Sequence, residues 1–153
     1  MTASGMEAKT TLALKVAAGL WVLWGLVHML AGAVVLSSDA AGAVAAVADA
    51  ATPEALAGAR YPDAAGALLN QHGWNLAWFG AATLIGAVWI WRGSLTGAWV
   101  TALIGGMADL GYFLFMDLGG HVHFLPGTVM TLVSGSAIVL SAWVWRRGGF
   151  RTA

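Results

Sequence analysis

The segment from Gln71 to Leu118 reads QHGWNLAWFGAATLIGAVWIW, then RGS, then LTGAWVTALIGGMADLGYFLFMDL, so two long apolar runs are separated by three residues. Each run is long enough to cross a membrane, because a helix needs about 20 apolar residues to span the hydrocarbon layer. The connection Arg92–Ser94 is so short that the two helices must be antiparallel neighbours. This segment therefore predicts a hairpin of two membrane helices.

Two further apolar runs flank the hairpin, one from about Leu12 to Leu36 and the other from about Leu125 to Trp145. We interpret the first run as a retained helix, because it exceeds the roughly 7–15 apolar residues of a signal-peptide core. The four spans, 12–36, 71–91, 95–118 and 125–145, predict an all-α integral membrane protein. We expect one domain, residues 1–153, folded as an antiparallel four-transmembrane-helix bundle.

The composition agrees with a lipid environment, since 59% of the residues are hydrophobic, 9% are charged and the mean hydropathy is +0.78. A soluble domain carries roughly 25% charged residues. The net charge of zero offers no basic patch for nucleic acid. The chain has no cysteine, which excludes disulfides, thiolate metal sites, iron–sulfur clusters and cysteine nucleophiles.

The basic residues predict the orientation of the spans. Only Arg60 lies on one side of the four-span arrangement, and six basic residues lie on the other. The six are Lys9, Lys15, Arg92, Arg146, Arg147 and Arg151. Because Lys and Arg collect on the cytoplasmic side, we expect a multi-pass protein of the inner (plasma) membrane with both termini cytoplasmic.

The loop between the first two spans, residues 37–70, therefore lies outside the cytoplasm. Within it, Thr52-Pro53-Glu54 combines a helix N-cap, a first-turn proline and an acid that favours the helix dipole. We expect a short surface helix from there to about Arg60.

Polar residues gather in the outer half of the predicted bundle, although burying such groups in a membrane is costly. His28 and Asp109 lie at similar depths on two rising spans, as counted along the helices. His72 begins the second span, and His121 and His123 lie in the turn between the third and fourth spans. We expect Asp117, near the outer boundary, to be solvated.

Each span carries a stripe of small and polar residues at helical spacing, which favours close packing inside a bundle. The stripes are Trp21, Gly25, His28 and Gly32; His72, Asn75, Phe79, Thr83 and Gly86; Gly105, Asp109, Tyr112 and Met116; and Thr128, Thr131 and Gly135.

The four histidines suggest a metal site. Alternate residues of an extended turn point the same way, so His121 and His123 together with His72 and His28 are the predicted ligands of a zinc, copper or iron ion. Asp109 is an alternative to His28. His28 and His72 are also the one intramembrane pair that could hold a haem. In the competing interpretation, His121 and His123 are solvated loop residues.

The main functional hypothesis is a membrane protein that binds a metal or redox cofactor, with haem and a quinone both open. The predicted cofactor-binding residues are His28, Asn75, Asp109 and Tyr112, and Trp24 and Phe79 are aromatic candidates for the lining. One alternative is a transporter or small-molecule-binding protein in which Asp109 and His28 relay a proton. Another is an accessory subunit in a homo-oligomer or larger membrane complex. Whether the chain is an enzyme stays open.

Overall fold

The structure is a computed structural model that describes residues 3–57 and 59–150. It is all-helical, at 83% helix, with no strand in the described residues. Four helical stretches are long and apolar enough to span a membrane, namely Ser4–Ser37, Asp63–Trp91, Leu95–Asp117 and Phe124–Arg146. The number and the approximate positions of the predicted spans are confirmed.

The first span is the helix α1, Ala3–Ser37, and the second is α4, Asp63–Trp91. Both begin earlier than predicted, at Ala3 rather than Leu12 and at Asp63 rather than Gln71. The apolar run marks only what the bilayer must cover, whereas the helix continues through polar residues that can remain helical outside it. At α4, Pro62 precedes the helix and Asp63 lies in its first turn, where an acid favours the helix dipole.

The third and fourth spans each combine α-helical and π-helical segments. The third contains α5 (Leu95–Thr101), η1 (Ala102–Gly106), α6 (Met107–Tyr112) and η2 (Phe113–Asp117), of which η1 and η2 are π-helical. The fourth begins with the π-helical η3 (Phe124–Thr128) and continues as α7 (Val129–Arg146).

Two short helices lie between α1 and α4. The predicted surface helix is present as α3, Pro53–Ala57, and ends before Arg60. The sequence interpretation missed α2, Ala40–Val47, whose N-cap residue Asp39 accepts a hydrogen bond from the Gly42 N–H at 2.8 Å. Such an N-cap satisfies a backbone donor that the first helical turn leaves free.

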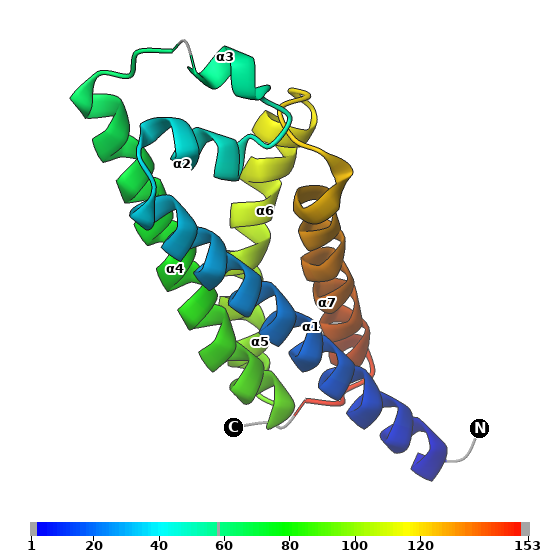
Figure 1. Cartoon of the computed structure of the whole chain (residues 1–153). Helices are drawn as coiled ribbons and strands as arrows, with labels where there is room; N and C mark the ends of the chain where they lie inside the picture. Colours follow the sequence, from blue (N-terminus) through cyan, green and yellow to red (C-terminus); the bar gives the residue numbers. More distant parts are fainter. Residues whose placement is uncertain (1–2, 58, 151–153) are drawn as a thin grey trace.

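The ends of the four long helices alternate between two ends of the molecule (Figure 1). We call the end with α2 and α3 the loop end, and the opposite end, where α4 turns into α5, the turn end. At the turn end, Gly93 adopts a φ of 80°, a conformation that glycine reaches without steric cost. The Ser94 hydroxyl then caps α5 by accepting from the Gly97 N–H at 3.1 Å.

Helix α1 is the centre of the packing and lies chiefly against α4 and then α7. Two glycines on each of the first two spans let the backbones approach. A Cβ on Gly25 would lie 2.8 Å from the Gly80 carbonyl oxygen, and one on Gly32 would lie 2.7 Å from the Ala77 nitrogen and meet the Gly73 carbonyl. Gly25 thus faces Gly80 while Gly32 faces Gly73, so α1 and α4 run antiparallel. Small residues at such contacts stabilise membrane helix pairs through van der Waals packing.

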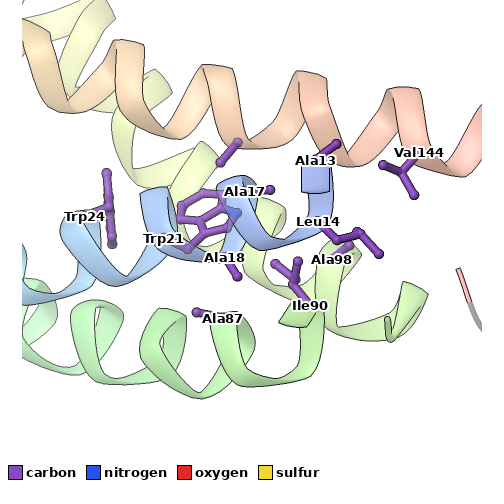
Figure 2. Close-up of a cluster of buried hydrophobic side chains, with 11 residues drawn as sticks. Ala13, Leu14, Ala17, Ala18, Trp21, Trp24, Ala87, Ile90, Ala98 and Val144 are labelled. Carbon is purple, nitrogen blue, oxygen red and sulfur yellow. The ribbon is translucent and has the colours of Figure 1, made fainter. Parts of the chain in front are cut away.

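The apolar core lies in the half of the molecule nearer the turn end (Figure 2). Helix α1 supplies most of it, including the fully buried Trp21 and Trp24, and Ile90 and Val144 reach it from α4 and α7. Gly105 makes room for Trp21, because a Cβ there would clash with the indole ring. Many large apolar side chains outside the core are exposed, among them Leu30, Phe115 and Val139, as expected for lipid-facing surfaces.

The predicted interior stripes agree with the structure on the first three spans better than on the fourth. Gly25, Thr83 and Gly105 are buried, together with Asp109. On α7 the buried positions are instead Ser134, Ala137, Ser141 and Val144. Thr128, Thr131 and Gly135 are only half-buried. The two sets lie on different faces of the fourth span. The sequence therefore predicted the wrong face of this helix for the interior.

Candidate functional site

Asp109 is the most deeply placed charged residue among those that the structure describes, with 4% of its surface exposed. The indole N–H of Trp24 on α1 donates to its Oδ2 at 2.7 Å. The Ser134 side chain on α7 lies near the carboxyl group, and its hydroxyl donates to the Thr131 carbonyl on its own helix at 3.1 Å. The Trp24 bond therefore gives Asp109 the hydrogen-bond partner that a buried carboxyl group requires.

The backbone around Asp109 departs from regular α-helix on both sides. Helix α6 carries Asp109 between η1 and η2, and at the end of η2 the Leu118 N–H bonds the Phe113 carbonyl, five residues back, at 3.0 Å. Such π-helical turns occur often at functional sites, where they change which face a side chain presents.

His28 lies beside Asp109 and is fixed by Trp24. Its ring stacks on the Trp24 indole with centroids 3.5 Å apart and planes at 16°. Its Nδ1 lies 2.8 Å from the Trp24 carbonyl oxygen, and its Nε2 lies 3.8 Å from Asp109 Oδ1. The side chains of His28 and Asp109 are 13% and 5% exposed, so the two residues predicted to share one depth form a largely buried pair.

Two cavities adjoin this pair, with volumes of about 100 Å³ and about 310 Å³. Six residues line both of them: His28, Val47, His72, Leu76, Asp109 and Tyr112. We call the two cavities together the His28–Asp109 pocket. Ligand sites of about 300–1,000 Å³ with an apolar lining and few polar groups are typical of small-molecule binding.

The larger cavity lies between α4 and the second half of the third span, lined by Leu76 and Phe79 on one side and by Gly111 and Phe115 on the other. Near the turn end, α4 packs against α5 and η1, but it makes no comparable contact with α6 or η2. Figure 1 shows α4 and α6 separating toward the loop end. Phe115 is 74% exposed, so this side of the pocket reaches the surface where lipid would lie.

The remaining predicted cofactor-binding residues divide into two groups. His72 and Tyr112 line both cavities. Asn75 lines neither, and its side-chain oxygen accepts a hydrogen bond from the Trp78 indole at 3.1 Å on the same helix. The structure also offers no hydrogen bond between Tyr112 and Asp109 among the described residues; the Tyr112 hydroxyl instead lies against Gly127.

The structure does not bring His121 and His123 into the pocket. Both are exposed, and neither lines either cavity. The first loop holds their backbone instead, because the His123 N–H donates to Asp49 at 2.7 Å and the His121 carbonyl accepts from the Ala50 N–H at 3.2 Å. Within residues 3–57 and 59–150, no three His, Asp or Glu side chains form a group that could hold a metal ion.

Asp117 differs from the expectation of a solvated residue. It is half-buried, its Oδ1 accepts a hydrogen bond from the Thr128 hydroxyl, and its Oδ2 is a buried atom without a partner in the described residues. This bond joins the end of the third span to the start of the fourth.

The site also contains residues that sequence analysis left out or used only as lining. Trp24 holds both His28 and Asp109, and its position four residues before His28 on the same helix face was the available signal. Val47 belongs to α2, a helix that the sequence did not predict. A separate cavity of about 600 Å³ at the turn end is lined by Glu7, Arg92 and Arg147 among others and contains none of the predicted site residues.

Comparisons of the chain with protein-family models, with curated proteins and with solved structures found no match.

Proposed function

We propose that the chain is an inner-membrane protein whose turn end faces the cytoplasm and whose two termini are cytoplasmic. Support comes from five basic residues at the turn end, against Arg60 alone at the loop end. The five are Lys9, Lys15, Arg92, Arg146 and Arg147, and Arg151 follows them in the sequence. In this orientation the His28–Asp109 pocket lies in the outer half of the membrane.

Within that frame, we propose that the protein binds a lipid-soluble molecule of the quinone class, meaning an apolar tail with an oxygen-bearing ring. The observation that carries this proposal is the placement of the buried His28–Asp109 pair on a pocket that is otherwise largely apolar and that opens between α4 and η2. A ligand dissolved in the bilayer could enter there and meet two hydrogen-bonding groups at the bottom.

The lining supports a flat aromatic ligand. Phe79 and Phe115 line the larger cavity, and the imidazole ring of His28, which lines both cavities, is held by stacking on the Trp24 indole behind it. Aromatic rings favour offset or edge-to-face packing with one another. Apolar walls with few polar groups are also the common design of small-molecule pockets.

The test is a titration of the full chain in lipid nanodiscs with a decyl-substituted benzoquinone. Binding is measured as quenching of tryptophan fluorescence. We expect saturable binding of one probe per chain beyond the quenching in nanodiscs with an unrelated membrane protein. The variant Gly111→Leu should fill the larger cavity without a backbone clash, because a Cβ there meets nothing within 4 Å. It should weaken binding by at least about tenfold, or about 1.4 kcal/mol.

The matched control is Gly135→Leu on α7, where a Cβ also meets nothing within 4 Å and which lines neither cavity. Its affinity should equal that of the unaltered chain. Absence of saturable binding, or equal affinity in both variants, would overturn the proposal. Metal analysis and an absorption spectrum of the same preparation test the other cofactors: a Soret band would replace the quinone by haem, and one bound metal ion per chain would replace it by an ion site.

A further inference from the structure

The hydrogen bonds around His28 fix which of its ring nitrogens carries a proton. Nδ1 lies 2.8 Å from the Trp24 carbonyl oxygen, and a carbonyl oxygen can only accept. Nδ1 therefore carries the hydrogen. In a neutral imidazole the other nitrogen is then a lone-pair acceptor, so Nε2 of neutral His28 presents a lone pair toward Asp109.

The two oxygens of the Asp109 carboxyl group also have different neighbours. Its Oδ2 already accepts from the Trp24 indole at 2.7 Å, and its Oδ1 faces His28 Nε2 at 3.8 Å. That separation is longer than the 2.7–3.2 Å of an N–H···O hydrogen bond. Trp24 thus forms hydrogen bonds with Nδ1 of His28 and Oδ2 of Asp109. The other two atoms, His28 Nε2 and Asp109 Oδ1, face each other across a gap that adjoins the pocket.

An isolated carboxylate in such apolar surroundings is costly. One proton held by the pair, on either Nε2 or Oδ1, makes the pair neutral overall. Wherever that proton lies, the pair then presents one hydrogen-bond donor and one acceptor across the gap. Among the described lining residues, His72 on α4 and Tyr112 on α6 are the other groups able to exchange a proton.

The ligand group that matches one donor and one acceptor is a hydroxyl, because its oxygen both donates and accepts. A hydroxyl oxygen about 2.8 Å from each facing atom would bridge the 3.8 Å gap. A quinone carbonyl or an ether oxygen only accepts, so it would leave the acceptor of the pair without a partner. No lysine or arginine lies among the described lining residues of either cavity, so a carboxylate or phosphate ligand would find no cation.

Resting on the proposed function, we infer that His28 and Asp109 together recognise a hydroxyl group, so the preferred ligand is a lipid-soluble phenol or quinol. The pocket then distinguishes a quinol from the corresponding quinone. The hydroxyl oxygen of the quinol both donates to and accepts from the pair, whereas the carbonyl oxygen of the quinone only accepts. A site built around a hydroxyl binds analogues that lack it more weakly, because one of its own buried polar groups is then left unpaired.

The experiment compares 4-nonylphenol with 4-nonylanisole, its methyl ether, on the full chain in nanodiscs. The two probes share a ring and a tail, but the ether cannot donate. We expect the phenol to bind at least about tenfold more tightly than the ether. The double variant His28→Phe/Asp109→Leu replaces both groups with apolar residues of similar shape and should bring the ratio close to one.

Asp109→Asn keeps the preference, because its amide oxygen can accept from Trp24 and its N–H can still donate toward the gap. Equal binding of phenol and ether by the unaltered chain would overturn this inference and leave the proposed pocket intact. A preference for the phenol that persists in the double variant would also overturn this inference and leave the proposed pocket intact. If the benzoquinone shows no saturable binding, the proposed function fails, and the inference that rests on it fails with it.

Discussion

Trp24 and Asp109 hydrogen-bond across 85 residues of sequence, with the indole N–H of one donating to Oδ2 of the other at 2.7 Å. Both side chains are buried, Trp24 completely. The bond ties the central helix α1 to α6 in the middle of the protein. Trp24 also accepts from His28 through its backbone carbonyl, so one residue orients both members of the pair.

Removing this donor should destabilise the fold. Trp24→Phe keeps an aromatic ring for His28 but leaves Oδ2 of Asp109 with fewer donors, and an unsatisfied buried polar group costs about 1–3 kcal/mol. We expect a loss of that size in unfolding free energy, measured by dodecyl sulfate titration of the protein in mixed micelles. The control is Trp78→Phe, whose exposed indole bonds Asn75 on its own helix; a loss of equal size there would contradict the role of the Trp24–Asp109 bond.

The position of the pair could be predicted because helices have a fixed rise per residue. Counting along two apolar runs placed His28 and Asp109 at one depth without knowledge of the contacts. The same counting could not place His121 and His123, because their turn is irregular. Its conformation depends on Asp49 and Ala50, which lie in the first loop and have no periodic relation to that turn.

The glycine contact between α1 and α4 yields a second stability test. In Gly25→Ala the new methyl group would lie 2.8 Å from the Gly80 carbonyl oxygen and 2.9 Å from Thr83 Oγ1. The helices must then move apart, and such overpacking typically costs about 1–3 kcal/mol. Gly19→Ala is the matched control on the same helix, because its Cβ meets nothing within 4 Å and alanine favours a helix. Equal effects of the two substitutions in the same unfolding titration would contradict the contact.

The sequence revealed Gly25 and Gly32 as part of an interior stripe but not the glycines that they meet. Gly73 and Gly80 lie next to the predicted polar stripe of the second span, which ran from His72 to Gly86. Choosing between neighbouring faces requires knowing that α4, and not the third span, packs along α1. Periodicity within one helix contains no information about its neighbours.

Helix α2 should control access to the pocket from the loop end. Val47 lines both cavities, so Val47→Phe should place a ring in that space and weaken binding of the benzoquinone probe by about tenfold, equivalent to about 1.4 kcal/mol. Ala45→Phe, at an exposed position of the same helix outside both cavities, should bind as the unaltered chain does. Equal affinities in the two variants, measured by fluorescence titration, would show that α2 does not close the pocket.

The proposed orientation makes a prediction that is independent of any ligand. Alkaline phosphatase is active only outside the cytoplasm, so its fusion near Arg60 should be active and its fusion after Arg151 inactive. The physical reason is the six-to-one distribution of Lys and Arg along the sequence between the two sides of the four spans. A third fusion at Gly93, in the connection between α4 and α5, should also be inactive because that turn shares the end of the molecule with the start of α1 (Figure 1).

Exchanging charges between the two sides tests whether the basic residues cause the proposed orientation. Four substitutions, Lys9→Gln, Lys15→Gln, Arg146→Gln and Arg147→Gln, neutralise the basic residues in the first half of α1 and at the end of α7. Arg92 then remains at the turn end, and Arg151 remains in the sequence after α7. Adding two lysines near Arg60 then favours the opposite orientation, and phosphatase activity should shift toward the Gly93 and Arg151 fusions. Activity at Arg151 in the unaltered chain would place the turn end outside the cytoplasm. The His28–Asp109 pocket would then lie in the cytoplasmic half of the membrane, with its internal geometry unchanged.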